Sequence, residues 1–258
     1  MSDPVRLAVT GAGGRMGHEV IEAARERGDC EVAVAVNRSP VDPVAGVAVA
    51  DAAEFPALLA DAEPAVDALV DFTGPGSSVE YVAAATEAGV ACVVGTTGFD
   101  GEQEAAIDAA AESVPVLRAS NFSRGIAALR RVVSEAAAAL PGYDVEVTET
   151  HHSGKVDAPS GTALTLLDDI EDARADLRER VHGREGDAPR TESEIGVHAR
   201  RAGDIAGEHE VLMAGDENVL ELTHRAGSRR VFAAGALDAA AWLAGRDAGA
   251  YDFTEVLE

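Results

Sequence analysis

A glycine-rich loop near the start of the chain is the feature that most constrains its fold. The loop Gly11-Ala12-Gly13-Gly14-Arg15-Met16-Gly17 lies between an apolar run at 5–9 and a stretch with helical spacing of apolar residues. Glycine allows positive φ and close approach of the backbone to a pyrophosphate, and the following helix N-terminus offers free N–H groups. A glycine-rich string can also be an ordinary tight turn. Its place between a strand and a helix nevertheless favours dinucleotide binding by residues 11–16.

Strands and helices alternate along the first part of the chain. Beyond the glycine loop, the apolar pattern predicts strands at 31–36, 68–72, 91–94 and 114–117, with helices at 78–87 and 102–112. This alternation is typical of a doubly wound, mostly parallel sheet, so we predict a Rossmann-like α/β fold.

The pattern changes after Asn121-Phe122-Ser123. A longer helix to about Leu140 is followed by strand-like segments at 145–150, 194–199, 209–214 and 219–224. Strands in succession with few helices between them indicate a mixed or antiparallel sheet, and hence a second, α+β domain. Residues 168–190 suggest a helix followed by an exposed loop, and residues 228–243 a final helix.

Acidic residues are in large excess. Asp and Glu number 46 against 21 Lys and Arg, which gives a formal net charge of −25, and Lys155 is the only lysine. Such a surface disfavours nucleic acid and anionic membranes as partners. The composition suggests a halophilic protein, because at about 1 M salt the Debye length is only about 3 Å and repulsion between carboxylates is screened. Codon bias could explain the missing lysines but not the extra carboxylates.

The chain shows no sign of export or of a membrane span. Its first residues lack a basic stretch followed by an apolar one, and no apolar run approaches ~18 residues. We therefore expect a cytoplasmic protein. Cys30 and Cys92 have no metal-ligand or redox spacing, so we expect both to be buried small hydrophobic residues and expect no metal.

Further candidates for cofactor binding follow the predicted strands, because ligands of open α/β sheets bind beyond the carboxyl ends of the strands. Asn37 and Arg38 follow the second strand, where an NAD-selective site usually has an acid. Asn37 would not repel a 2′-phosphate and Arg38 could pair with one, so NADPH is favoured over NADH, although Arg38 could be merely a surface residue. The remaining loops are Gly95-Thr96-Thr97 and Ala119-Ser120-Asn121-Phe122.

The segment from His151 to Thr162 concentrates groups that can transfer protons and bind anions. It contains His151, His152 and Lys155, and its Ser160-Gly161-Thr162 precedes an apolar helical run. Free N–H groups at that helix N-terminus, with the Thr162 hydroxyl, could bind a carboxylate. Histidine and lysine can exchange protons near the substrate. A surface histidine pair and a simple helix cap are the alternatives.

Taken in order, these motifs resemble one enzyme family, 4-hydroxy-tetrahydrodipicolinate (dihydrodipicolinate) reductase. The resemblance covers nearly the whole chain, and its most specific string is His-His-x-x-Lys-x-Asp-Ala-Pro-Ser-Gly-Thr from His151. The other matching segments are the glycine loop, Asp71-Phe72-Thr73, Gly95-Thr96-Thr97, Asn121-Phe122-Ser123, Arg201-Ala202-Gly203-Asp204, Gly207-Glu208-His209 and residues 229–242.

The resemblance implies a reaction of lysine and diaminopimelate biosynthesis, in which a cyclic imine dicarboxylate loses water and accepts a hydride at C4 from NADPH or NADH. It implies that His151 and Lys155 transfer protons and that His152, Gly161 and Thr162 bind the substrate. Residues 11–16, Arg38, 95–97 and 120–122 would line the cofactor. It also implies a homotetramer, with residues 1–121 and 231–258 in the dinucleotide-binding domain and 122–230 in the substrate-binding and oligomerisation domain.

Two other functions remain open from the sequence. Another small Rossmann reductase would keep the same first domain. One example, an acylating aldehyde dehydrogenase, needs a nucleophilic cysteine on a loop, and Cys92 argues against it because it lies in a predicted strand. A non-catalytic nicotinamide-sensing protein would need the glycine loop but not His151, Lys155 and a carboxylate site together.

Overall fold

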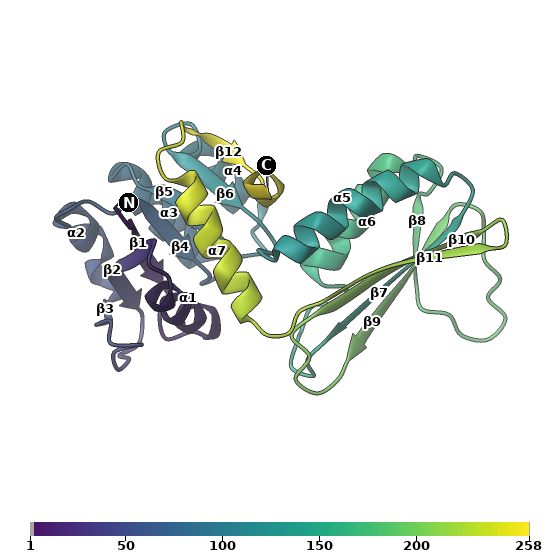
Figure 1. Cartoon of the computed structure of the whole chain (residues 1–258), viewed down its shortest axis with the longest axis horizontal. Coiled ribbons are helices and arrows are strands. Elements are labelled where there is room, and N and C mark those ends of the chain that lie inside the picture. The colour runs from purple at the N-terminus through teal and green to yellow at the C-terminus, as the bar shows by residue number, and fades with distance from the viewer. Residues whose placement is uncertain (1–2, 258) are drawn as a thin grey trace. The chain divides into compact units, whose positions relative to one another are not determined.

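The structure, a computed structural model, describes residues 3–257 and divides into two compact units (Figure 1). Unit 1 extends to Phe122 and resumes at Arg229, and unit 2 comprises Ser123–Ser228. The resemblance implies these transitions at 121/122 and 230/231. Cys30 and Cys92 are both buried and unbridged, as expected for small hydrophobic residues.

The sheet of unit 1 is parallel throughout, as predicted for a Rossmann-like fold. All its strands therefore present their carboxyl ends at one edge. In spatial order they are β12 (Gly249–Tyr251), β6 (Pro115–Arg118), β5 (Ala91–Val94), β4 (Ala68–Asp71), β1 (Val5–Thr10), β2 (Cys30–Asn37) and β3 (Ala50–Asp51).

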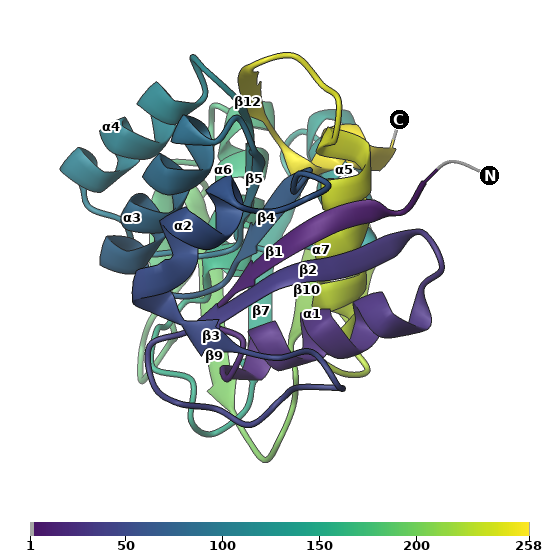
Figure 2. The same ribbon diagram turned by 90° about the vertical axis from the view of Figure 1, so that its left-hand side faces the viewer.

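Helices cover both faces of this sheet (Figure 2). One face carries α1 (Arg15–Glu26) and α7 (Arg230–Leu243), and the other carries α2 (Phe55–Ala60), α3 (Pro75–Glu87) and α4 (Gly101–Ala110). Small residues let α7 pack closely: a Cβ built on Gly235 would overlap the carbonyl oxygen of Phe122. Short 3-10 helices, η1 (Ala52–Glu54) and η2 (Phe253–Leu257), complete the unit.

Unit 2 is a five-stranded mixed sheet with two helices. Its order is β11 (Asn218–Arg225), β10 (Glu208–Gly215), β7 (Asp144–His151), β9 (Glu194–Arg201) and β8 (Glu179–His182). The first three strands are antiparallel, and β9 and β8 continue parallel to β7. Helices α5 (Arg124–Ala139) and α6 (Gly161–Ala173) bury apolar side chains against one face, where residues such as Val145, Val147 and Val211 form the core.

The loop predicted after the helix in 168–190 is wrong in part, because β8 lies within it. This strand has the sequence Glu-Arg-Val-His, is only partly buried, and pairs on one side with β9. A short edge strand of this kind lacks the apolar alternation by which strands are recognised. None of the helices within residues 3–257 is long and apolar enough to cross a membrane.

Candidate active site

The glycine loop connects β1 to α1 at the carboxyl edge of the unit 1 sheet. Gly11 has a φ of +65°, and its carbonyl accepts a 2.8 Å hydrogen bond from the Gly14 amide. A Cβ built on Gly17 would overlap the Gly11 carbonyl oxygen and lie 2.9 Å from the Ala12 Cα. The loop and the first turn of α1 thus approach each other as closely as glycine allows, an arrangement that fits a pyrophosphate at the helix N-terminus.

Asn37 fastens this loop to the end of β2. Its Oδ1 accepts a 3.2 Å hydrogen bond from the Gly13 amide, and its Nδ2 donates to the Ser39 carbonyl at 2.8 Å. The side chain therefore positions the loop and carries no negative charge. The neighbouring Arg38 is exposed and forms no ion pair within the described part of the chain, so its guanidinium is available to an anionic group.

A cavity of about 350 Å³ lies at the same edge. Four of its lining residues are predicted cofactor residues: Gly11, Gly14, Asn37 and Arg38. The other lining residues were not assigned, although they follow β4 or begin α3: Phe72, Thr73, Gly74, Ser77 and Tyr81. Their place was predictable in principle, because they lie where a predicted strand ends and a helix begins with Pro-Gly.

A buried carboxylate joins the loops around this cavity. Asp71, at the end of β4, is fully buried, and its Oδ1 accepts hydrogen bonds from the hydroxyls of Thr10 at 2.6 Å and Thr73 at 2.7 Å. Its Oδ2 accepts one from Thr96 at 3.0 Å and another from Ser78. One side chain thereby links the ends of β1, β4 and β5 with α3.

The other two predicted loops lie at this edge too, since they follow β5 and β6. Gly95 packs against the Phe72 ring so closely that a Cβ would overlap it. Thr96 is buried and Thr97 exposed, whereas Phe122 is buried and packs edge-on against Phe72, with ring centroids 5.5 Å apart. The residues of unit 1 therefore fit a dinucleotide lying along the carboxyl ends of the strands.

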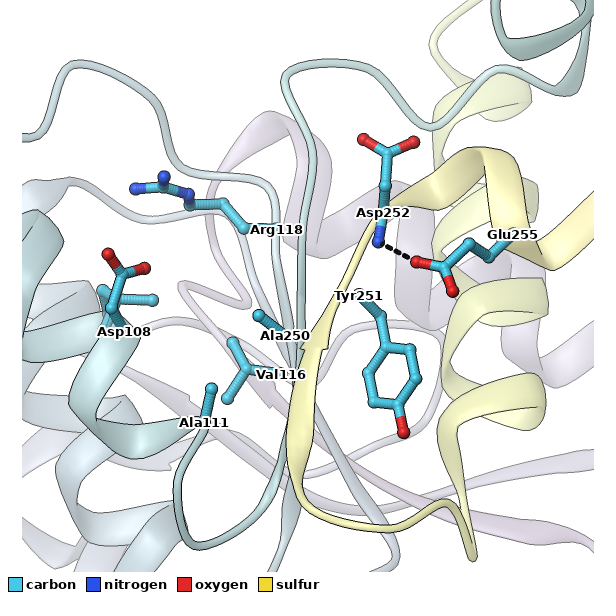
Figure 3. Close-up of a pocket in the computed structure, with 9 residues that line it drawn as sticks. Asp108, Ala111, Val116, Arg118, Ala250, Tyr251, Asp252 and Glu255 are labelled. Atoms are coloured by element: carbon cyan, nitrogen blue, oxygen red, sulfur yellow. Dashed lines mark hydrogen bonds between the residues drawn. The ribbon is translucent and has the colours of Figure 1, made fainter.

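A second cavity of about 350 Å³ in unit 1 lies between α4, β6 and β12 (Figure 3). It is lined by one cation, Arg118, and by the carboxyl groups of Asp108, Asp252 and Glu255, of which Glu255 accepts a 2.8 Å hydrogen bond from the Asp252 amide. None of the predicted cofactor residues lines it. Its mixed lining shows no chemistry that selects one class of ligand.

In unit 2, the end of β7 places His151 against a buried carboxylate. Glu149 and His151 are two residues apart on the strand and point to the same face, and the His151 Nδ1 lies 2.5 Å from the Glu149 Oε2. Arg201, on β9, donates to both oxygens of Glu149 at 2.9 and 2.8 Å. Burial alone would raise the pKa of Glu149, but the hydrogen bonds from Arg201 and His151 lower it below its usual value.

The predicted anion site is the N-terminus of α6. Ser160 caps the helix, because its hydroxyl accepts a 3.2 Å hydrogen bond from the Ala163 amide. The Ser160 amide in turn donates to the Glu149 Oε1 at 3.2 Å. Gly161 and Thr162 form the first turn, and Thr162 is buried. The helix N-terminus and His151 are thus tied to the same carboxylate.

Lys155 lies on the loop between β7 and α6. Its Nζ forms a 2.8 Å ion pair with the Asp157 Oδ1, and its backbone amide donates to the His152 carbonyl at 3.1 Å. Arg201 fixes the loop by donating to the Asp157 carbonyl at 2.5 Å. Within unit 2, His151 ends β7, His152 and Lys155 lie on the loop that follows, and Gly161 and Thr162 form the first turn of α6.

His209, on β10, adjoins this group. It is 2% exposed, its ring packs edge-on against His151 with centroids 5.2 Å apart, and its Nε2 lies 3.1 Å from the Ser160 hydroxyl. Burial lowers the pKa of His209 to about 3, so this imidazole is neutral at physiological pH. The sequence alone predicts no role for Glu149, Arg201 or His209. The spacing of Glu149 and His151 on a predicted strand was the signal for the first of them.

A parallel Rossmann-like sheet with a glycine loop, followed by a unit that gathers histidine, lysine and a helix N-terminus, defines the class of nicotinamide-dependent reductases. Family models described as "Dihydrodipicolinate reductase, N-terminus" and "Dihydrodipicolinate reductase, C-terminus" match residues 5–122 and 125–257. The chain belongs to the dihydrodipicolinate reductase family.

Relatives and a solved structure agree with this assignment. Proteins named 4-hydroxy-tetrahydrodipicolinate reductase from the halophilic archaea Natronomonas pharaonis and Haloarcula marismortui are each 53% identical and cover 98% of this chain, over 100% and 99% of their own lengths. A structure titled "Dipicolinate bound Dihydrodipicolinate reductase from Paenisporosarcina sp. TG-14" has a TM-score of 0.74 at 24% identity, covering 96% of this chain and 97% of that one. The last likeness concerns the fold alone.

These findings confirm the predicted fold class and the predicted enzyme class, an NAD(P)H-dependent oxidoreductase of lysine biosynthesis by the diaminopimelate route. The resemblance drawn from the motifs is likewise confirmed. The roles of individual residues, the preference for NADPH and the assembly state remain predictions.

Proposed function

We propose that the chain reduces (2S,4S)-4-hydroxy-2,3,4,5-tetrahydrodipicolinate to (S)-2,3,4,5-tetrahydrodipicolinate, with NADPH as the preferred reductant and with loss of water. The observation that carries the proposal is the clustering of two proton-exchanging side chains, His151 and Lys155, with the capped N-terminus of α6. A cyclic dicarboxylate needs both kinds of group. The names of the relatives at 53% identity support the same substrate.

In the reaction, a hydride reaches C4 of the substrate, one proton is consumed and water leaves. When bound, the nicotinamide cofactor supplies the hydride. Lys155 donates a proton from Nζ, and His151 donates or accepts one through its ring. His152, with the backbone N–H groups of Gly161 and Thr162 in the first turn of α6, binds the substrate carboxylates, because the helix N-terminus carries the positive end of the dipole.

An activity assay separates this function from the two alternatives. The full chain, in molar KCl, is mixed with freshly generated substrate, and NADPH oxidation is followed by absorbance. Oxidation that depends on this substrate is the expected result. Another small reductase would oxidise NADPH only with a different carbonyl or imine, and a nicotinamide-sensing protein would bind NADPH without turnover. Either of those two results would contradict the proposal.

We infer that Arg38 makes NADPH the preferred cofactor. Arg38→Ala should raise the KM for NADPH about tenfold, the equivalent of one charge-assisted hydrogen bond, and leave the KM for NADH nearly unchanged. Arg246→Ala is the matched control, because it also removes one exposed arginine of unit 1. The Arg246 guanidinium stacks on Trp242, away from the glycine loop. Equal changes for both cofactors would show that Arg38 does not contact the 2′-phosphate.

We expect salt to raise activity. The cofactor and the substrate are anions, and the chain has a formal net charge of −25, so long-range repulsion slows their binding in dilute buffer. Screening in molar KCl should raise kcat/KM about tenfold relative to low salt. A KCl series with both substrates varied measures this effect. Activity that is highest in dilute buffer and falls steadily with KCl would refute the halophilic interpretation.

We also propose that the enzyme is a cytoplasmic homotetramer assembled through the sheet of unit 2. The support is that α5 and α6 cover only one face of this sheet (Figure 1). On the edge strand β11, Val219 is 63% exposed. A mixed sheet whose second face is open to a partner copy is consistent with contacts between subunits.

A further inference from the structure

Glu149 is a buried carboxylate that the proposed reaction does not use. Its side chain is only 1% exposed, and each of its two oxygens has two hydrogen-bond partners. Oε2 faces the His151 Nδ1 and one Arg201 nitrogen, and Oε1 faces a second Arg201 nitrogen and the Ser160 amide. Such a carboxylate is a pure acceptor, so the group that approaches it must bring the proton.

This geometry determines which nitrogen of His151 carries the proton in the neutral ring. The Nδ1–Oε2 distance of 2.5 Å requires a proton between the two atoms, and Glu149, whose pKa is lowered, leaves it on the imidazole. The Nδ1–H therefore donates to Glu149. The Nε2 is left with a lone pair, and it faces away from Glu149 toward Gly207, on whose Cα a built Cβ would lie 3.1 Å from Nε2.

We propose that Glu149 is a positioning residue for His151: it accepts the Nδ1–H hydrogen bond, so that His151 exchanges its reaction proton through Nε2 alone. The same carboxylate accepts from the Ser160 amide, which fixes the imidazole relative to the N-terminus of α6. The imidazole that transfers the proton and the helix N-terminus that binds the carboxylate are therefore held at a fixed distance from each other. This inference rests on the proposed function of His151 and adds the atom through which it acts.

Charged and titratable groups surround His151 from every neighbouring element. Glu149 on β7, Arg201 on β9 and Lys155 on the following loop act on it directly, and His209 on β10 packs against its ring. His224 on β11 acts on His209, and Asp157 is paired with Lys155. Burial lowers the pKa of His151, and the charges of Lys155 and Arg201 lower it further, whereas Glu149 opposes them. Loss of the Glu149 charge must therefore lower the pKa of His151.

Glu149→Gln tests this effect with little change in shape. Because the pKa of His151 falls, the limb of the kcat–pH profile that reports His151 should move to lower pH by about 1 unit, whether His151 acts as acid or base. Glu146→Gln is the matched control: Glu146 is also on β7 and pairs with a histidine, His198, at 2.7 Å, but on the opposite face of the strand. It should leave the profile unchanged.

A direct measurement needs no activity. In the full-length protein with 15N-labelled histidine, in molar KCl, the ring shifts identify the tautomer of each histidine, and His151→Asn assigns the His151 signals. We expect a proton on Nδ1 and none on Nε2 in neutral His151, and a pKa lower by about 1 unit in Glu149→Gln. A proton on Nε2 in the wild type, or an unmoved His151 titration in Glu149→Gln, would overturn the proposal.

The two measurements separate this inference from the proposed reaction. A wild-type protein that shows the expected tautomer but does not reduce the substrate would refute the proposed function alone. If Glu149→Gln does not fold, the wild-type tautomer still decides. A Glu149→Gln enzyme that loses kcat without any shift of its pH profile would show a purely structural role and would also overturn the proposal.

Discussion

Replacing Lys155 with Ala should lower kcat by ~10² or more, the usual contribution of a positioned proton donor. Lys155 is the only lysine of the chain, and its Nζ is paired with the Asp157 carboxylate at 2.8 Å on a loop that Arg201 fixes to β9. Its removal takes away both a proton and a cation beside an anionic substrate. Steady-state kinetics in molar KCl measure the loss.

Lys155→Arg distinguishes the two contributions. Arginine keeps the positive charge but does not give up its proton, because its guanidinium stays protonated in proteins. We expect Lys155→Arg to recover much of the KM for the substrate and little of the kcat. If Lys155→Ala turns over as fast as the wild type, Lys155 has no part in the reaction.

Replacing Gly17 with Ala should lower kcat/KM for NADPH about 10²-fold, as expected for a displacement of about 1 Å in a binding loop. The added methyl would lie 2.8 Å from the Gly11 carbonyl carbon and 2.9 Å from the Ala12 Cα, and it would overlap the Gly11 oxygen. All of these are backbone atoms, so the loop itself has to move. The strain should also lower the free energy of unfolding by about 1–3 kcal/mol.

Gly28→Ala is the control for this variant. Gly28 follows the same helix, and a Cβ built on it has nothing within 4 Å. We expect its NADPH kinetics and its thermal unfolding to match the wild type. If Gly17→Ala also matches the wild type in NADPH affinity, the glycine loop does not bind the pyrophosphate.

Much of the fold could be predicted because its periodicity is strong. The buried runs of β1, β4 and β5 are short and wholly apolar or nearly so, and α1 repeats buried Val20, Ile21 and Ala24. The elements that the pattern missed are short or lie at edges: β3, α2, β8 and β12. Such elements depend on pairing or packing with distant residues, and local sequence carries little of that information.

The site divides in a similar way. Residues that share a loop could be found together, so the segment from His151 to Thr162 was identified from its sequence. Arg201 and His209 also lie in matching motifs, but only the pairing of β9 and β10 with β7 shows that they adjoin His151 and Glu149. Glu149 was overlooked because a glutamate on a strand is usually assigned to the solvent face, whereas here it is buried with its partners.

The carboxylate of Asp71 holds together the loops at the carboxyl edge of the unit 1 sheet by hydrogen bonds to hydroxyl groups, without ion pairs. Its four partners, Thr10, Thr73, Ser78 and Thr96, are neutral hydroxyls. Asp71 is fully buried, so dissolved cations do not reach it, and no neighbouring cation is needed to hold the loops in place. Salt screens the charges on the surface, so we expect it to change how fast anionic ligands bind, whereas the buried hydrogen bonds of Asp71 should keep the loops in the same arrangement at any salt concentration.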